Sequence, residues 1–259
     1  QFLRNKVAGA DVVAITDVDR NRAEVLIGEL GGGIDFYSDI ESLLSNGNLD
    51  GLIIASPDSL HVEHLRIALN YQIPTLCEKP LATKVEDASQ ISLEIREFES
   101  RMKRPMIHLG FMRRFDPPYL KVRSLLESGD FGSPLFIRAA TRNLHSKGIT
   151  NEGLYTNIAV HDFDIWQWMF NAEWVSVNSH YPISSSLSPG GLIDPLVFTA
   201  KLSNGVMLVA DIVANSNYGY DVRTELVCEK GSIEIGIHGD VITRSNRVAG
   251  VGKGGDRKS

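Results

Sequence analysis

The first 111 residues alternate short apolar runs with longer amphipathic segments, and this alternation constrains the fold more than any other feature. Strands are expected at 11–17, 49–56, 75–80 and 106–111; the first is rich in β-branched residues and the second is almost continuously apolar. Segments with helical periodicity lie between them, at 20–30, 40–46, 59–71 and 84–100. Strands that are apolar along their whole length are covered on both faces. The sequence therefore predicts an α/β unit with a doubly wound parallel sheet.

The pattern changes after Arg113, where strands begin to outnumber helices. Helices are expected after Pro117 and at 155–170, and strands at 134–142, 174–181, 195–202, 206–214, 221–228 and 231–236. Ser203-Asn204-Gly205 joins two of these strands as a hairpin turn. Successive antiparallel strands with few helices indicate a separate α+β domain. We expect the two domains at 1–112 and 113–259.

The composition excludes several classes of function. With 32 acidic and 26 basic residues, the net charge is -6, which disfavours a protein that binds nucleic acid. No run of about 18 apolar residues is present, so we expect no membrane span. The two cysteines, Cys77 and Cys228, lack metal-ligand spacing. We interpret them as buried free thiols in a reducing cytoplasm.

Asp17 ends the first apolar run, the position at which a Rossmann-type domain carries the acid that binds the adenine ribose. A carboxylate there repels the 2′-phosphate of NADP and favours NAD, although Arg20 and Arg22 leave NADP possible. The glycine-rich phosphate loop belongs about 20 residues earlier. Residues 1–16 contain no G-x-G-x-x-G. Either the domain binds no dinucleotide, or the sequence lacks its first strand and phosphate loop. We favour the second alternative, with residues 2–8 ending the first helix.

Several polar residues follow the other predicted strands, where loops at carboxyl ends form the ligand crevice of such a sheet. We expect the cofactor to be bound there by Asp17, Ser56, Pro57, His61, Glu78 and Lys79. His61 and His64 have a spacing that could hold a metal, but no third ligand is near them in the sequence. A capping or surface role is the preferred interpretation of these two histidines, and no metal site is expected.

Four motifs together resemble the glucose–fructose oxidoreductase / inositol dehydrogenase (Gfo/Idh/MocA) family. They are EKPLA at 78–82, GFMRRFDPPY at 110–119, AVHDFDIWQW at 159–168 and NYGYD at 217–221. The resemblance covers about residues 2–244 and is closest to the inositol 2-dehydrogenases. It implies a Rossmann domain, a second domain with a large, mainly antiparallel open sheet, and homo-oligomers, either tetramers or dimers. Family members usually continue for some tens of residues, so the second domain is expected to be incomplete at its C-terminus.

The resemblance also implies a reaction, the NAD(P)-dependent oxidation of a secondary alcohol without a metal. A cyclic polyol such as myo-inositol is the expected substrate, and a sugar or aldose is the alternative. A non-catalytic binding module remains the other possibility if the native chain truly lacks the phosphate loop. No nucleic acid or membrane is expected as a partner.

The expected catalytic residues are Lys79, His161 and Asn157. Oxidation releases a proton, which an imidazole can accept, while a lysine polarises the alcohol oxygen. The two roles could be exchanged. Inositol dehydrogenases often carry Asp four residues before this histidine, whereas this chain has Asn157.

Substrate contacts are expected from polar and aromatic side chains of the second domain. These are Arg113, Asn143, His145, Asn157 and Tyr220. Arg113 resembles the substrate-side arginine of the family, with Arg114 left to form a salt bridge. Tyr220 could instead pack within a hairpin.

Overall fold

The chain forms two compact units in a computed structural model, residues 1–110 and 111–259. The structure describes residues 7–236 and 240–245. The division falls two residues before the expected boundary at 112/113. The helix end expected at 2–8 lies largely outside the described residues. Within the described part, no helix is long and apolar enough to cross a membrane.

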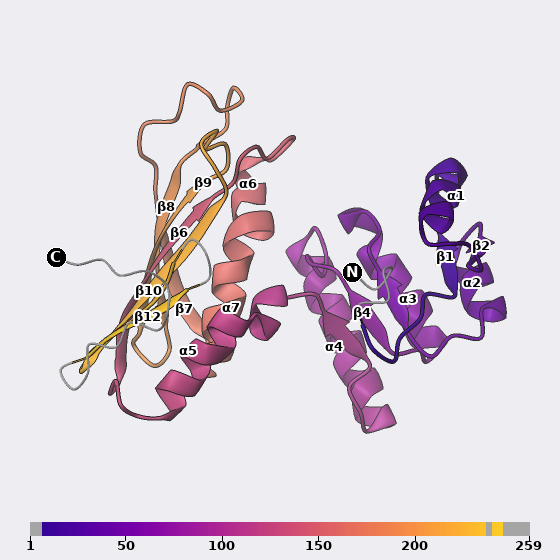
Figure 1. Cartoon of the computed structure of the whole chain (residues 1–259), viewed down its shortest axis with the longest axis horizontal. Coiled ribbons are helices and arrows are strands. Elements are labelled where there is room, and N and C mark those ends of the chain that lie inside the picture. Colours follow the sequence, from indigo (N-terminus) through magenta and orange to yellow (C-terminus); the bar gives the residue numbers. More distant parts are fainter. Residues whose placement is uncertain (1–6, 237–239, 246–259) are drawn as a thin grey trace. The chain divides into compact units, whose positions relative to one another are not determined.

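Unit 1 (residues 1–110) contains parallel strands with helices between them (Figure 1). β1 (Ala14–Thr16) pairs with β2 (Asp35–Tyr37). β3 (Leu52–Ile54), β4 (Thr75–Cys77) and β5 (Ile107–Leu109) form a second parallel sheet in that order. The helical segments are α1 (Arg20–Glu29), α2 (Ile40–Asn46), the 3₁₀ turn η2 (Asp58–Leu60), α3 (His61–Asn70) and α4 (Val85–Met102).

Side-chain caps fix the starts of the first two helices. Asp19 accepts a hydrogen bond from the backbone N–H of Arg22 at 3.2 Å, and Asp39 accepts one from Ser42 at 2.7 Å. Each cap satisfies a helix N–H that has no partner within its own helix. Apart from β2, the order of strands and helices is as predicted, which confirms the Rossmann-like parallel architecture.

The sheet of unit 1 differs from the prediction in two respects. β2 was not expected, and the parallel strands form two separate sheets within the described residues. Ile53 of β3 is 47% exposed, although its apolar run predicted a strand covered on both faces. The continuous apolar run therefore correctly predicted a strand in a parallel sheet, but it wrongly predicted that Ile53 would be buried.

Both cysteines are buried, and burial raises the pKa of Cys77 to about 12 and that of Cys228 to about 11. A thiol alkylates as the thiolate, so at pH 8 only about one Cys77 in ten thousand is reactive. We expect iodoacetamide to label neither residue in the folded protein and both in 6 M guanidinium, as measured by intact mass. Rapid labelling of the folded protein would contradict this burial.

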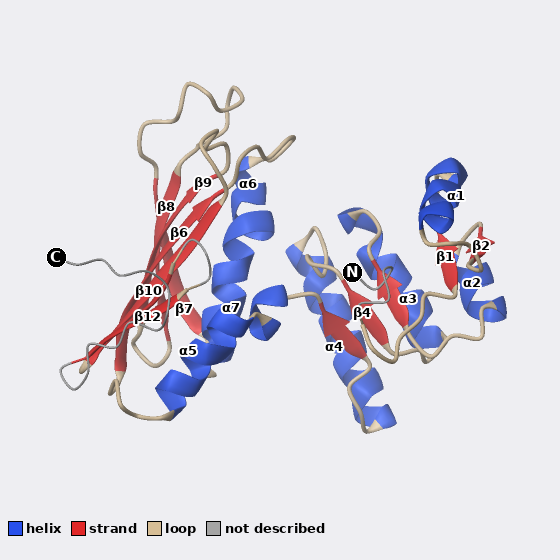
Figure 2. Cartoon of the chain, viewed as in Figure 1, coloured by secondary structure: helices blue, strands red, loops and turns tan. Residues whose placement is uncertain are grey.

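Unit 2 (residues 111–259) is built on a large sheet, drawn in red in Figure 2. Its seven strands follow the order β12-β11-β10-β6-β9-β8-β7. Only β6 and β9 are parallel to each other; the other neighbouring strands are antiparallel. The strands are β6 (Pro134–Arg142), β7 (Trp174–His180), β8 (Leu196–Leu202), β9 (Met207–Val213), β10 (Asp221–Cys228), β11 (Gly231–Ile235) and β12 (Val241–Ser245). The large, mainly antiparallel sheet is confirmed, and β12 adds an edge strand that was not predicted.

The helices of unit 2 cover one face of this sheet (Figures 1 and 2). They are the 3₁₀ turn η3 (Met112–Phe115), α5 (Pro117–Glu127), α6 (Asn151–Gly153), the π-helix η4 (Leu154–Ala159) and α7 (Val160–Phe170). Trp166 of α7 is fully buried and makes an edge-to-face contact with Tyr119 of α5 at 6.3 Å between ring centroids. Trp166 is therefore a core residue of unit 2.

The segment expected to be one α-helix over 155–170 begins as a π-helix and becomes α-helical only at Val160. A π-helix gives each turn an extra residue and often occurs at functional sites. Here it ends two residues before His161.

Candidate active site

The loops after β3 and β4 bring Ser56 and Pro80 to the same edge of the unit 1 sheet. The two strands are parallel and in register, with Ile54 opposite Cys77. The backbone ladder continues one residue further, where the N–H of Glu78 donates to the carbonyl of Ile54 at 2.9 Å. Ser56-Pro57 and Glu78-Lys79 therefore follow neighbouring strand ends, as predicted.

His61 lies between these two loops and is completely buried. Its Nδ1 is 2.7 Å from the carbonyl oxygen of Pro80, and its Nε2 is 2.9 Å from that of Ser56. The surface or capping role preferred from the sequence is therefore wrong for His61. Both ring nitrogens lie within hydrogen-bond distance of backbone carbonyl oxygens, so the ring joins the loop after β3 to the loop after β4.

His64, one turn further along α3, holds the side chain of Ser56. Its Nδ1 is 3.0 Å from the Ser56 hydroxyl oxygen. Burial lowers the pKa of His64, so the ring is neutral near pH 7 and can accept this hydrogen bond. Two histidines of one helix thus fix both the carbonyl and the hydroxyl of Ser56. Within the described residues, no group of three or more metal-binding side chains occurs.

Asp17 follows β1 at the carboxyl end of its strand. Its Oδ1 accepts a hydrogen bond from the N–H of Asp19 at 2.8 Å, and its side chain is 28% exposed. The second oxygen is 3.9 Å from the guanidinium of Arg22. A partly exposed carboxylate fits the hydroxyl groups of an adenine ribose, which donate hydrogen bonds. The residues present therefore fit the nucleoside end of NAD, with Arg22 close enough to moderate the charge of Asp17.

Gly110 permits the end of β5 to pack closely against Glu78. Its N–H donates to the carbonyl of Cys77 at 2.7 Å. A Cβ at this position would lie 3.0 Å from Oε2 and 3.3 Å from Cα of Glu78. Any larger residue would push on the backbone next to Lys79. The sequence motif beginning at Gly110 drew attention to its arginines, and this steric role was missed.

In unit 2, the two arginines of η3 form ion pairs with two aspartates of α7. Arg113 Nη1 donates to Asp162 Oδ1 at 2.6 Å, and Arg114 pairs with Asp164 through two nitrogens. Both arginines therefore form ion pairs, whereas the sequence had offered a salt bridge for Arg114 as an alternative. Because Arg113 is only 6% exposed, its guanidinium is committed to Asp162 instead of facing solvent. The two sequence motifs, Arg113-Arg114 and Asp162-x-Asp164, therefore bind each other and join η3 to α7.

Burial alone would lower the pKa of Arg113, but the charge of Asp162 and the neighbouring Tyr119 and Tyr220 outweigh burial and raise it. Tyr220 itself is largely exposed. It therefore lies near the buried ion pair while its side chain remains accessible. Since Asp162 follows His161 directly, the Arg113–Asp162 pair fixes the helix backbone beside the expected catalytic histidine.

Asn157 lies in the π-helix and His161 in the first turn of α7, and both are half-buried. The buried side of this segment includes Ile158 and Ile165 together with the ion-paired Asp162. Tyr155 anchors its start, because its hydroxyl is 2.5 Å from that of Ser179 on β7. The two expected catalytic side chains of unit 2 are thus held on a helix packed against the sheet.

Asn143 and His145 follow β6, at the sheet end where β9 also finishes. The carbonyl of Asn143 accepts a hydrogen bond from the N–H of Ser216 at 2.8 Å, and the N–H of Ser146 donates to Asn215 Oδ1 at 3.2 Å. His145 is exposed. These bonds join the loop after β6 to the loop that leads to Tyr220.

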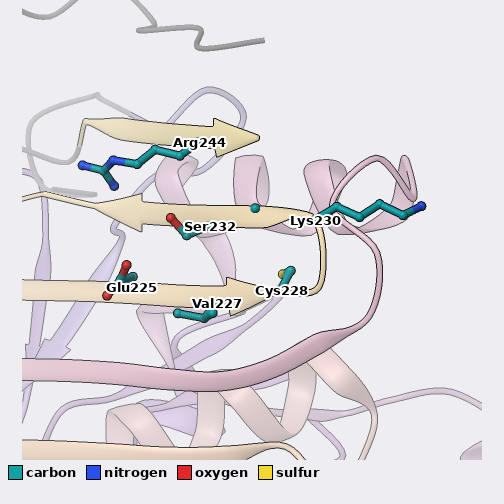
Figure 3. A pocket seen from close by; sticks show the side chains of 7 residues that line it. Glu225, Val227, Cys228, Lys230, Ser232 and Arg244 are labelled. Carbon is teal, nitrogen blue, oxygen red and sulfur yellow. The ribbon is translucent and has the colours of Figure 1, made fainter. Parts of the chain in front are cut away.

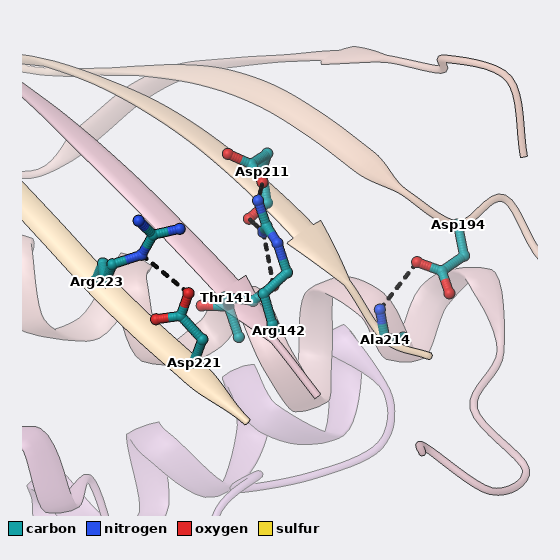
Figure 4. Close-up of polar contacts among 7 residues, drawn as sticks. All are labelled: Thr141, Arg142, Asp194, Asp211, Ala214, Asp221 and Arg223. Carbon is teal, nitrogen blue, oxygen red and sulfur yellow. Dashed lines mark hydrogen bonds and ion pairs between the residues drawn. The ribbon is translucent and has the colours of Figure 1, made fainter. Parts of the chain in front are cut away.

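Asp194 binds the start of the second of these loops through Ala214, and it was missed in the sequence (Figure 4). Its fully buried carboxylate accepts hydrogen bonds from the backbone N–H groups of Ala214 and Asn215 at 2.9 and 3.1 Å. It also accepts from Asn215 Nδ2 at 3.2 Å and from the Ser188 hydroxyl at 2.8 Å. Asp194 therefore fixes the loop that contains Asn215. That loop in turn forms hydrogen bonds with the segment from Asn143 to Ser146.

Asp194→Asn is expected to lower the free energy of unfolding by about 2–4 kcal/mol, because an amide NH₂ would face N–H donors and leave them unsatisfied. Urea unfolding followed by circular dichroism measures this loss. Ser188→Ala, which removes only one of the four donors, should cost about 1 kcal/mol. Equal stabilities of wild type and Asp194→Asn would disprove the supporting role.

A shallow hollow on the outer strands β10–β12 is lined by charged and small side chains (Figure 3). Its charged lining residues are Glu225, Lys230 and Arg244. None of the expected catalytic or binding residues lines it. The hollow is therefore distinct from the candidate site.

A Rossmann-like parallel unit with Asp17 and Lys79 after its strand ends, and a second unit that carries a half-buried histidine on a helix, indicate a nicotinamide-nucleotide-dependent dehydrogenase. Residues 1–102 match the family described as "Oxidoreductase family, NAD-binding Rossmann fold". Residues 119–234 match the Gfo/Idh/MocA C-terminal domain. The chain belongs to the Gfo/Idh/MocA family of oxidoreductases, as the sequence motifs predicted.

Among its relatives is inositol 2-dehydrogenase 1 of Saccharopolyspora erythraea, 34% identical over 96% of this chain and 73% of the relative. Inositol 2-dehydrogenase of Corynebacterium glutamicum (strain R) is 38% identical over 90% of this chain and 68% of the relative. Among solved structures, myo-inositol dehydrogenase from Lactobacillus casei, in complex with NAD(H) and myo-inositol, has a TM-score of 0.83. It is 30% identical and matches over 90% of this chain and 68% of that chain.

Proposed function

We propose that the protein is an NAD-dependent dehydrogenase that oxidises a secondary alcohol of a cyclic polyol, with myo-inositol or a related inositol as substrate. The observation that carries the proposal is the 34% identity to an inositol 2-dehydrogenase over 96% of the chain. The L. casei structure with NAD(H) and myo-inositol supports the same chemistry. Asp17 favours NAD over NADP, since its carboxylate repels a 2′-phosphate, and Arg22, 3.9 Å away, offsets part of that charge.

The roles of the residues follow from the chemistry of alcohol oxidation. When bound, NAD supplies the acceptor for the hydride of the alcohol carbon. Lys79 polarises the alcohol oxygen and stabilises developing alkoxide charge, and His161 accepts the proton. Asn157 orients the imidazole. Asn143, His145 and Tyr220 bind the other hydroxyl groups, whereas Arg113 supports the site through Asp162.

Activity with a substrate panel tests this function. The purified protein is incubated with NAD and, separately, with myo-inositol, scyllo-inositol, glucose and galactose, and NADH is followed at 340 nm. We expect the inositols to give the highest kcat/KM. A preference for an aldose would favour the sugar dehydrogenase alternative. If no substrate produces NADH and calorimetry detects no NAD binding, the protein would instead be a non-catalytic binding module.

Asn157→Ala is expected to lower kcat about tenfold, because one orienting hydrogen bond is worth about 1.4 kcal/mol. Asn157→Asp, which introduces the carboxylate found in many inositol dehydrogenases, should retain at least the wild-type kcat. Thr156→Ala is the control, since Thr156 is exposed and bonds only the carbonyl of Glu152. An unchanged kcat in Asn157→Ala would remove this residue from the mechanism.

The proposal includes a homo-oligomer formed through the sheet face opposite the helices. Met207 and Val209 point outward there and are 43% and 41% exposed, with the half-buried Phe136 beside Met207. Apolar side chains on an uncovered sheet favour association with a second copy. Val209→Glu should shift the mass measured by light scattering toward the monomer.

The two buried free thiols also suit a cytoplasmic protein.

A further inference from the structure

The ring of His61 is the contact that joins the two cofactor-side loops beyond the end of the strand ladder. Backbone pairing between β3 and β4 runs as far as the Glu78 N–H and the Ile54 carbonyl. Two residues beyond this last backbone bond, the imidazole connects the carbonyl oxygens of Ser56 and Pro80. Its Nε2 is 2.9 Å from the first oxygen and its Nδ1 is 2.7 Å from the second. The ring therefore sets the separation of these two loops.

We propose that His61 is a positioning residue for Lys79, holding the backbone from which the lysine reaches the substrate. The carbonyl that it binds belongs to Pro80, the residue directly after Lys79. On the opposite side, Gly110 packs against Glu78, the residue directly before it. The residues before and after Lys79 are thus both held in place, Glu78 by packing against Gly110 and Pro80 by its contact with His61. This inference rests on the proposed role of Lys79 in turnover.

The helix that carries His61 is well suited to hold a ring rigidly. Leu65, Ala68 and Leu69 occupy the same face of α3 as His61 and are all buried. His64 adds its contact with the Ser56 hydroxyl from the next turn. Because the helix cannot shift without disturbing the core, the position of the ring is transmitted to Pro80. Misplacing a catalytic group by about 1 Å can cost about a hundredfold in rate.

Two substitutions separate positioning from packing. His61→Phe keeps an aromatic ring but removes both nitrogens, whereas His61→Gln keeps one N–H donor able to reach a carbonyl. We expect kcat to fall between about tenfold and a hundredfold in His61→Phe and by a smaller factor in His61→Gln. His108→Gln, an exposed histidine of the neighbouring strand β5, is the matched control and should leave kcat unchanged. Circular dichroism verifies that each variant is folded.

A double-mutant cycle with Lys79→Ala shows whether His61 acts through the lysine. If it does, His61→Phe should change the residual kcat of Lys79→Ala by less than about twofold, since the group that it positions is gone. The same factor in both backgrounds would overturn the inference, as would a wild-type kcat in His61→Phe. If the phenylalanine variant does not fold, His61→Gln is used in the same cycle.

The cycle also distinguishes this inference from the proposed function. Near-normal turnover in Lys79→Ala itself would reject the catalytic role of the lysine. A severe loss in Lys79→Ala combined with independent effects of His61→Phe would keep the catalytic role and reject only the positioning by His61.

Discussion

Lys79→Ala should lower kcat at least a hundredfold while the protein stays folded. The loss corresponds to about 2.7 kcal/mol of transition-state stabilisation, the size expected when a charged group that stabilises an alkoxide is removed. Single-turnover measurements with saturating NAD and myo-inositol isolate the chemical step. Folding should be unaffected because Lys79 contributes no buried apolar side chain to the core of unit 1.

Lys84→Ala is the matched control for this experiment. Lys84 lies five residues further along the chain, is exposed and precedes α4. Its substitution should change kcat by less than about twofold. Calorimetry with NAD should give similar affinities for both variants if Lys79 acts on the substrate oxygen. Near-normal turnover in Lys79→Ala would exclude the proposed mechanism.

Arg113→Ala should have the largest effect on stability, a loss of about 3–5 kcal/mol in the free energy of unfolding. The substitution leaves Asp162, which is 1% exposed, as a buried charge without its counter-ion. It also removes the guanidinium that packs on the ring of Tyr119, 5.7 Å from the ring centroid. Urea unfolding of unit 2, followed by tryptophan fluorescence, measures the change.

The exposed ion pair between Arg244 and Glu234 provides the comparison for Arg113. Its 3.0 Å distance resembles that of the buried pair, but Arg244 is largely exposed to solvent. Arg244→Ala should therefore cost less than about 1 kcal/mol. If Arg113→Ala were equally mild, Asp162 would have to be neutral or solvated, and the buried ion pair would not hold α7 in place.

The fold could be predicted where a periodic pattern was long enough to read. The limits of α2, β6 and β10 agree with those expected from the sequence. β2 was missed because three residues, one of them a charged aspartate, give too short a pattern. The π-helix was missed because one extra residue in a turn leaves no distinct apolar periodicity.

The candidate site was predictable in its residue types but not in their connections. The need for partners of the two aspartates on α7 could be anticipated, yet the pairing of Arg113 with Asp162 depended on tertiary packing. His61 could have been recognised as buried, because Leu65, Ala68 and Leu69 repeat on its face of the helix. Nothing near Asp194 in the sequence indicated that it would be saturated by donors from residues 188, 214 and 215.

The central position of β6 has a consequence for synthesis of the protein. Its two neighbours, β9 and β10, supply pairing residues that follow β6 by roughly 70 to 90 positions, so its contacts are strongly non-local. At ribosomal rates, β6 waits on the order of ten seconds for these partners. During that interval an apolar strand has two open edges, whereas unit 1 already has its local pairings. Newly made chains should therefore be most prone to aggregate after unit 1 has folded and before β10 has emerged.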